Sequence, residues 1–279
     1  MFKSVGLVAR YDRRKAVKLA EDLAKHLTAR GLDVYAEETL VKKTKVRIPS
    51  IPLEQMRTDF IIAIGGDGTI LRTCITIPKP EPPILAINMG VRGFLTEIEP
   101  QKALTAVNKC LAGSFEIEKY LKLSIAADGL NFPDALNEVV ISPDEPAKLL
   151  YAHIFRDGER ILDCQSDGLM VATQTGSTGY SMSAGGPVLD PGVNAFVLTP
   201  VIPLSIFHPI VFPSNSELTI EIIKSRGTQI LVDGHHRQIA TSKLPRIKIT
   251  RSKYETSFIR FRHNFYDRLR NRLFFRGIK

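Results

Sequence analysis

The chain has 279 residues, of which 44% are hydrophobic and 24% charged, and its mean hydropathy is −0.01. These values are ordinary for a soluble globular protein and exclude a disordered chain, a collagen-like repeat and a small disulfide scaffold. The three cysteines are too few and too scattered for a structural zinc site. An odd, sparse count is typical of a reducing compartment, so we expect a cytoplasmic protein.

The net charge of +9 comes mostly from the end of the chain, because residues 251–279 carry nine basic and two acidic side chains. A tail of this kind suits nucleic acid or an anionic membrane surface. Its apolar residues recur at a spacing of four, however, which predicts an amphipathic helix that docks on the protein and leaves its arginines in solvent: Phe261, Phe265, Leu269 and Leu273, with Phe258 and Tyr266 beside them. No stretch approaches the roughly 18 apolar residues of a membrane span. We therefore expect neither a nucleic-acid nor a membrane partner.

The first half of the chain alternates predicted strands and helices. Val5–Ala9 is interpreted as a strand and not as a signal peptide, because no cleavage site follows a long apolar run. Residues 13–30 have apolar residues at helical spacing, and Gly31 suits the helix exit. The remaining predicted elements are a strand at Leu32–Ala36, a strand at Asp59–Ile64, a helix at Ile70–Ile75 and a strand at Ile84–Ile87. This alternation predicts a Rossmann-like parallel sheet with ligand loops at the carboxyl ends of its strands.

The second half is predicted to be rich in strands. An Asp157-Gly158 pair between two of them indicates a hairpin turn. The predicted strands are Phe115–Ala126, Ala135–Ile141, Leu149–Phe155, Ile161–Cys164, Leu169–Thr173, Ala195–Thr199, Glu217–Ile223, Gln229–Val232 and Arg246–Thr250. We therefore predict an α/β domain at 1–113, an all-β domain at 114–255, and a C-terminal helix at 256–279 that packs back on the first domain.

Gly65-Gly66-Asp67-Gly68-Thr69 lies between a buried strand and a predicted helix. Glycines let backbone N–H groups approach a phosphate closely, and the helix N-terminus favours an anion. The motif is neither of the commoner phosphate loops. A carboxylate in such a loop indicates a role with a metal or a proton, and Asp67 is the candidate base of a phosphoryl transfer. The alternative is a tight turn capped by Asp67.

A basic cluster after the first strand either attracts phosphates or only solvates the first helix: Arg10, Arg13, Arg14, Lys15 and Lys18.

A second loop is rich in glycine and hydroxylated side chains, running from Thr173 through Gly176–Tyr180 to Ser183–Pro187. Such a loop offers uncharged donors and acceptors suited to ribose and adenine edges, and Tyr180 adds an aromatic face. A flexible Ser/Gly linker is the alternative, but apolar strands flank this segment and linkers usually lack a bulky aromatic residue.

These motifs together resemble the NAD kinase family along nearly the full length of the chain. Gly-Gly-Asp-Gly-Thr alone is shared with diacylglycerol, sphingosine and phosphofructo-kinases, whereas the whole set in this order is specific. The matching segments are Gly65–Thr69, Asn88-Met89-Gly90 with Gly93-Phe94-Leu95, Asn137-Glu138, Asp167-Gly168, Gly176–Tyr180 with Ser183–Pro187, and Thr199-Pro200 with Pro203.

The resemblance implies a phosphorylation of NAD to NADP at the 2′-hydroxyl of the adenosine ribose. Asp67 would be the catalytic base, and Gly65, Gly66, Gly68 and Thr69 would hold phosphates. The implied donor is ATP or inorganic polyphosphate, with Mg²⁺ or another divalent cation, and no dedicated metal ligand is assigned. The implied fold is an α/β domain followed by a β-sandwich. The implied NAD contacts are Asn137, Glu138, Thr178, Gly179, Tyr180 and Ser183.

The resemblance also implies a homodimer or homotetramer, because Asp167 matches an aspartate that reaches the NAD of a neighbouring subunit. Two residues depart from the family pattern: Gln174 replaces a usual proline, and His208 stands in a stretch where arginine is common. These departures leave loop shape and donor preference open. His235 and His236 follow a predicted strand and contact either a ligand or only the protein. Two other functions remain: a lipid kinase that shares the first loop, and a non-enzymatic protein that binds a dinucleotide or nucleic acid.

Overall fold

The computed structural model describes residues 2–90, 93–127, 129–204, 207–240, 244–262 and 265–273, without the side chains of 271–273. The chain separates into two compact units. The first comprises the described residues up to Lys119 and from Thr256 onward, and the second comprises Tyr120–Glu255. Among the described residues, every helix is too short or too polar to cross a membrane.

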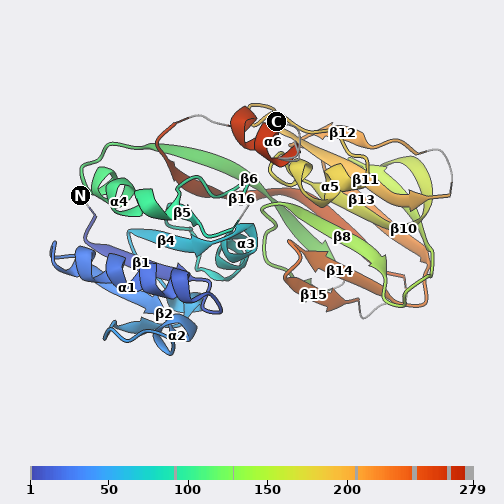
Figure 1. The fold of residues 1–279 in the computed structure, drawn as a ribbon. Coiled ribbons are helices and arrows are strands. Elements are labelled where there is room, and N and C mark those ends of the chain that lie inside the picture. Colours follow the sequence, from blue (N-terminus) through green and yellow to red (C-terminus); the bar gives the residue numbers. More distant parts are fainter. Residues whose placement is uncertain are drawn as a thin grey trace. The chain divides into compact units, whose positions relative to one another are not determined.

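The first unit is built on a parallel sheet (Figure 1). Its strand order is β3-β2-β1-β4-β5, and the carboxyl-terminal part of a long strand, β16, lies beside β5 through a parallel pair of Phe258 and Ile84. The predicted Rossmann-like sheet is therefore confirmed. The strands are β1 at Ser4–Ala9, β2 at Asp33–Glu37, β3 at Ser50–Ile51, β4 at Phe60–Gly65, β5 at Ile84–Asn88 and β16 at Arg246–Arg260.

Helices cover both faces of this sheet. α1 (Arg14–Thr28) and α4 (Ala103–Leu111) share one apolar core with β1, β2, β4 and β5. α3 (Asp67–Thr76) contacts β4 and β1, but its buried apolar residues lie outside that core, which places it on the opposite face. The short elements are α2 at Glu38–Val41, η1 at Leu53–Gln55 and η2 at Pro100–Lys102. Apolar residues therefore alternate toward two helical layers, as expected of a buried parallel sheet.

The order of the strands identifies where this sheet can bind a ligand. From β1 the chain moves outward through β2 to β3, and it then returns to place β4 and β5 on the other side of β1. Ligands of open α/β sheets bind at such a switch point, outside the carboxyl ends of the strands. The amide of Arg10, just after β1, donates to the carbonyl of Ile64 in β4 at 2.9 Å. The glycine loop that follows β4 therefore lies at the switch point.

The second unit is an antiparallel, β-rich structure. Its main sheet has the order β15-β14-β8-β10-β9-β13-β16, while β11 pairs with β10 and β12, and β6 pairs with β16 and β7. The β-rich character predicted for this half is confirmed. The strands are β6 at Glu116–Ala127, β7 at Leu130–Asn131, β8 at Glu138–Pro143, β9 at Leu150–Arg156, β10 at Glu159–Ala172, β11 at Ala195–Pro203, β12 at Ile210–Pro213, β13 at Leu218–Lys224, β14 at Thr228–Val232 and β15 at His236–Ile239.

Two strand predictions need correction, and one turn is confirmed. Ile161–Cys164 and Leu169–Thr173 belong to one strand, β10, which pairs first with β9 and then with β8 and β11. These partners, distant in sequence, carry the backbone pairing through the residues between the two predicted strands. β16 likewise continues well past the predicted end at Thr250. The Asp157-Gly158 turn joins β9 to β10 with φ angles of 51° and 86°, as a type I′ hairpin requires.

The predicted C-terminal helix is α6, Phe265–Leu273. The ring of Phe265 packs edge-on against Phe94 of the first unit at 5.4 Å between centroids, so the helix returns to that unit as predicted. The predicted solvated arginine face does not include Arg268, which is buried with its guanidinium over the Phe94 ring, whereas Arg270 is exposed. Phe258, predicted beside the helix, is instead a buried residue of β16. The end of the basic tail, 274–279, lies outside the described residues.

Candidate active site

The glycine loop forms a tight passage from β4 into α3. Gly65 ends the strand, Gly66 precedes the helix, and Asp67 is its first residue. A Cβ on Gly65 would lie 2.2 Å from Oγ1 of Thr69, so no larger residue fits there, whereas the space beside Gly66 is open. The loop therefore combines a backbone exposed on one side with a helix N-terminus, the arrangement that binds anions.

The carboxylate of Asp67 is held by the backbone of a neighbouring segment. The amide of Phe94 donates to both of its oxygens at 3.0 and 2.9 Å, and the amide of Leu95 donates to Oδ1 at 3.0 Å. Asp67 is thus more than a cap of its own helix, because residues far along the chain orient it. Gly93-Phe94-Leu95 was a matching motif without an assigned role, and its amides are site groups that the sequence did not reveal.

In the second unit, the structure brings the Asn137-Glu138 motif and the second loop together. The amide of Thr173 donates to the carbonyl of Asn137 at 2.8 Å. A Cβ on Gly176 would lie only 2.1 Å from that same carbonyl oxygen, and one on Gly179 would lie 3.5 Å from Oε2 of Glu138. Two motifs that are separate in sequence therefore form one surface.

The second loop is a folded element, which excludes the linker alternative. Residues 173–178 are buried, and Gly176–Thr178 forms the short helix η3. α5, Tyr180–Ser183, follows at once. The side chains of Tyr180 and Ser183 are exposed, so they are available to a ligand, whereas Thr178 is buried and donates to the carbonyl of Thr175 at 3.0 Å.

Several buried polar atoms of this surface have no hydrogen-bond partner among the described residues. They include Oδ1 of Asn137, Oε1 of Gln174 and Oγ1 of Thr175. Buried polar groups are nearly always hydrogen-bonded in folded proteins, so such a cluster indicates a place where a ligand or water completes the bonding. Gln174 therefore contributes a polar atom here that the usual proline of the family would lack.

A buried aspartate that was not among the predicted site residues supports this surface. Asp233 accepts hydrogen bonds from the backbone amides of Leu136, Asn137 and Glu138 at 2.7, 2.7 and 2.9 Å. Burial raises the pKa of its carboxyl, and these three donors and the charge of Lys122 offset part of that increase. Its signal in the sequence is an Asp-Gly pair directly after the predicted strand Gln229–Val232.

Asp167 and the two histidines lie elsewhere in the second unit. Asp167 is an exposed residue within β10, not part of a loop. His235 belongs to the β14–β15 turn, and His236 begins β15 with its ring edge-on to Phe132 at 6.1 Å. The ring of His236 contacts the protein, but its Nε2 is buried without a hydrogen-bond partner among the described residues, so a ligand contact of His236 remains a prediction.

We expect Gly176→Ala to lower the free energy of unfolding by about 3 kcal/mol, because the new methyl group would overlap the backbone of Asn137. Urea denaturation measures this change. Gly66→Ala is the matched control, since its Cβ would enter open space at an ordinary φ of −101° and should change stability little. Equal stabilities for the two variants would contradict the packing of the loop against Asn137.

The family models for the ATP-NAD kinase N-terminal and C-terminal domains match residues 5–115 and 136–261. An NAD kinase of Thermococcus gammatolerans is 42% identical over 279 residues, with 96% of this chain and 98% of the relative covered. The chain belongs to the NAD kinase family. This membership confirms the resemblance and decides against a lipid kinase and against a non-enzymatic binding protein.

Two solved structures of similar proteins support the same fold. An NAD kinase from Archaeoglobus fulgidus, determined in complex with ATP, is 27% identical with a TM-score of 0.78, covering 96% of this chain and 99% of the other. A yeast NADH kinase, determined with NADH, has a TM-score of 0.87, and the match covers 100% of this chain and 90% of the other. Its identity of 24% supports a similarity of fold alone. The fold of this chain is thus similar to that of a solved NAD kinase over nearly its whole length.

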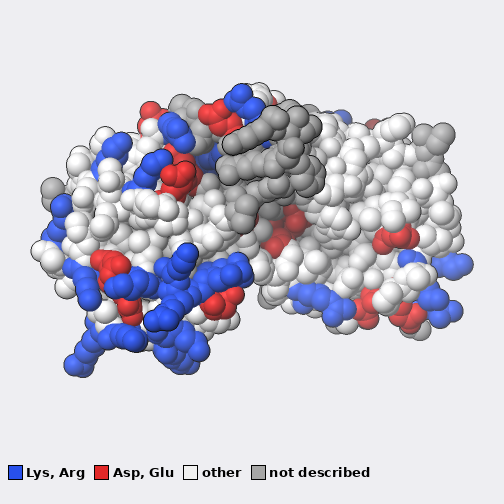
Figure 2. Space-filling model, in the orientation of Figure 1, with Lys and Arg blue, Asp and Glu red and all other residues white. Residues whose placement is uncertain are grey.

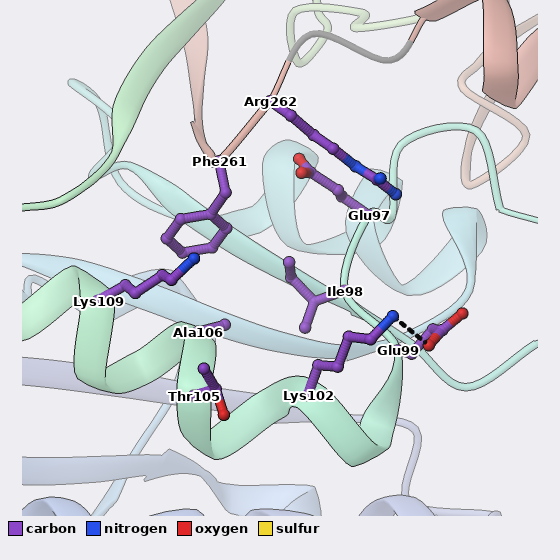
Figure 3. Close-up of a pocket in the computed structure, with 9 residues that line it drawn as sticks. All are labelled: Glu97, Ile98, Glu99, Lys102, Thr105, Ala106, Lys109, Phe261 and Arg262. Carbon is purple, nitrogen blue, oxygen red and sulfur yellow. Dashed lines mark ion pairs between the residues drawn. The ribbon is translucent and has the colours of Figure 1, made fainter.

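Two other surface features lie outside the family's motifs. A pocket of about 470 Å³ in the first unit contains none of the predicted site residues (Figure 3). Figure 2 shows Lys and Arg side chains gathered on the first unit over α1 and α2. Within the predicted basic cluster, Arg10 pairs with Asp12 and Lys18 with Asp22, at 2.9 and 2.8 Å. This local pairing favours a solvated helix face over a phosphate site.

Proposed function

We propose that this enzyme transfers the terminal phosphoryl group of ATP or inorganic polyphosphate to the 2′-hydroxyl of the adenosine ribose of NAD, giving NADP. Phosphorylation of NAD follows from membership in the family. The observation that carries the mechanism is the carboxylate of Asp67, fixed by two backbone amides beside the N-terminus of α3.

In this proposal Asp67 orients the ribose hydroxyl and accepts its proton as the new O–P bond forms. An ionised carboxylate has about four lone-pair directions. The amides of Phe94 and Leu95 donate to it from one segment and so fix its direction. Gly65, Gly66 and Gly68 would hold phosphate oxygens through backbone N–H groups and the helix terminus, with Thr69 beside them, whose own amide donates to the carbonyl of Gly66 at 3.0 Å.

The second unit is proposed to bind the coenzyme. Asn137 and Glu138 would contact its ribose and adenine region, and the buried partnerless oxygen of Asn137 supports this role. The remaining proposed contacts are Thr178, Gly179, Tyr180 and Ser183. Asp167 is exposed on β10, as a residue that reaches the NAD of a neighbouring subunit must be. We accordingly propose a homodimer or homotetramer, located in the cytoplasm.

The described residues do not supply a dedicated site for the expected Mg²⁺. Among them, no group of three or more His, Cys, Asp or Glu side chains is gathered as metal ligands. Mg²⁺ commonly binds through substrate phosphates with only one or two protein carboxylates. The divalent cation is therefore proposed to arrive with the donor, and no step assigned to Asp67 depends on it.

The test is an assay of NADP formation from NAD with ATP and polyphosphate compared side by side. We expect NADP with at least one donor, detected by a dehydrogenase that accepts only the 2′-phosphorylated coenzyme. Phosphorus NMR of the product locates the new phosphate. A product phosphorylated at another hydroxyl, or no product with either donor, would refute the proposed reaction.

A further inference from the structure

The orientation of Asp67 depends on the segment that carries Phe94 and Leu95. Leu95 donates its amide to Oδ1 of Asp67 at 3.0 Å. The side chains of Phe94 and Leu95 are buried, at 5% and 2% exposed, so the segment packs within the first unit. Any group that fixes this segment also fixes the direction of the Asp67 carboxylate.

Arg260, at the end of β16, binds this segment. Its Nη1 donates to the carbonyl oxygen of Leu95 at 3.0 Å. Leu95 is therefore held at its amide by Asp67 and at its carbonyl by Arg260. The path from the guanidinium to the proposed base runs through one residue and two hydrogen bonds.

Arg260 is itself rigidly held. It is 1% exposed, its Nε donates to Glu118 at 2.8 Å, and its Nη1 lies 3.7 Å from the carboxylate of Glu97. Its guanidinium also packs on the ring of Phe258 at 4.7 Å. Burying a guanidinium is costly unless carboxylates and hydrogen bonds compensate it. Here the two carboxylates and the Phe258 ring compensate the buried charge and orient the guanidinium, so that its Nη1 points at the carbonyl of Leu95.

The segment is also covered on the side of the Phe94 ring. Phe265 packs edge-on against that ring, and the guanidinium of Arg268 lies over it at 5.6 Å. Glu97, which lies near Arg260, and Phe261, which follows it in the chain, line the pocket of Figure 3, where both are drawn. These further contacts hold the segment in the protein even if the bond from Arg260 is lost.

We propose that Arg260 is a positioning residue for the phosphoryl transfer, which sets the direction of the Asp67 carboxylate through the backbone of Leu95. This inference rests on the proposed function, since it requires Asp67 to be the base. The buried ion-pair group of Arg260, Glu118 and Glu97 then contributes to turnover as well as to stability.

The test is Arg260→Lys, which keeps the charge but lacks the planar fork that serves Glu118 and Leu95 together. We expect kcat to fall by about 10²-fold, as for a misplaced reacting group, while KM for NAD and for the donor changes less than about two-fold. Hydrogen exchange of the Phe94 and Leu95 amides should become faster. These local and kinetic changes are not expected of a residue that only stabilises the fold.

Arg72→Lys is the matched control. Arg72 makes a two-pronged pair with the buried carboxylate of Glu37 in the same unit, and none of its described hydrogen bonds reaches Leu95. We expect it to lose comparable stability while keeping kcat and the protection of the Leu95 amide.

If the folded Arg260→Lys enzyme kept the kcat of Arg72→Lys, or lost activity through KM alone, the inference would be overturned. If that variant does not fold, Glu118→Ala removes the acceptor that orients the guanidinium toward Leu95, and faster exchange of the Leu95 amide with an unchanged kcat would overturn the inference equally. A fully active Asp67→Asn enzyme would instead refute the proposed base. An inactive Asp67→Asn with a normal Arg260→Lys would refute only the positioning role.

Discussion

Asp67→Asn is expected to phosphorylate NAD about 10²- to 10⁴-fold more slowly than the unchanged enzyme, the usual contribution of a positioned general base. The amide has the shape of the carboxylate, and its oxygen can still accept the N–H groups of Phe94 and Leu95 as Oδ1 does now. Its NH₂ group takes the place of Oδ2, which shares the Phe94 amide at 2.9 Å, so only this shared contact is lost. The amide cannot take a proton from the ribose hydroxyl. The fold and the affinity for NAD should therefore remain, which calorimetric titration with NAD measures beside the steady-state kcat.

The control for this variant is Asp59→Asn in the same unit. Asp59 also accepts two backbone N–H groups, from Lys3 and Ser4 at 2.6 and 2.9 Å, but it precedes β4 whereas Asp67 follows it. The two changes remove the same charge from similar hydrogen bonds at opposite ends of one strand. We expect Asp59→Asn to keep its kcat. Comparable turnover in the two variants would rule out proton transfer to Asp67.

The glycine loop was predictable because its signals are local. An uninterrupted apolar run ends at Ile64, glycines follow, and a helical pattern begins a few residues later. The strand order then places the loop at the switch point of the sheet without further information. The same local logic predicted the Asp157-Gly158 turn, in which both φ angles are positive.

Features that depend on distant partners were not predictable from the pattern. Arg260 and Arg268 appear in the sequence as members of a basic tail, and only the tertiary packing shows them buried against Glu118 and Phe94. β10 was predicted as two strands, with Gln165–Gly168 left between them. In the fold, Gly168 lies where a Cβ would be 2.9 Å from the carbonyl of Ile141, so the close approach of β8 explains the glycine.

The candidate coenzyme surface was predictable in its residues but not in its construction. Hydroxyl- and glycine-rich composition indicated the second loop, and family resemblance indicated Asn137-Glu138. Neither signal shows that Gly176 must be small because it lies on the backbone of Asn137. Composition also does not reveal the role of Asp233. It accepts hydrogen bonds from three consecutive amides that lie almost 100 residues earlier in the chain. The residues proposed to contact the coenzyme form short sequence motifs, whereas the residue that supports them lies far along the chain.

Asp233→Asn is expected to weaken NAD binding about ten-fold and to lower the free energy of unfolding by about 1–3 kcal/mol, the cost of a buried polar group without a partner. The amide oxygen can accept from Asn137 and Glu138 as Oδ1 does now. Its NH₂ group would then face the amide of Leu136, donor against donor, where Oδ2 accepts at 2.7 Å. The backbone of the Asn137-Glu138 motif must shift to relieve that contact. Urea denaturation and calorimetric titration with NAD measure the two effects.

Asp157→Asn separates this effect from a general cost of changing an Asp-Gly turn. Asp157 has a φ of 51°, close to the 49° of Asp233, and both residues precede a glycine in the second unit. Asparagine tolerates this conformation, and Asp157 accepts one exposed amide, from Glu217 at 2.8 Å. Its variant should therefore change stability by less than about 0.5 kcal/mol and leave the affinity for NAD unchanged. An Asp233→Asn protein that is destabilised but binds NAD normally would show that the coenzyme does not depend on the backbone of Asn137-Glu138, and the proposed contacts in the second unit would then have to be reassigned.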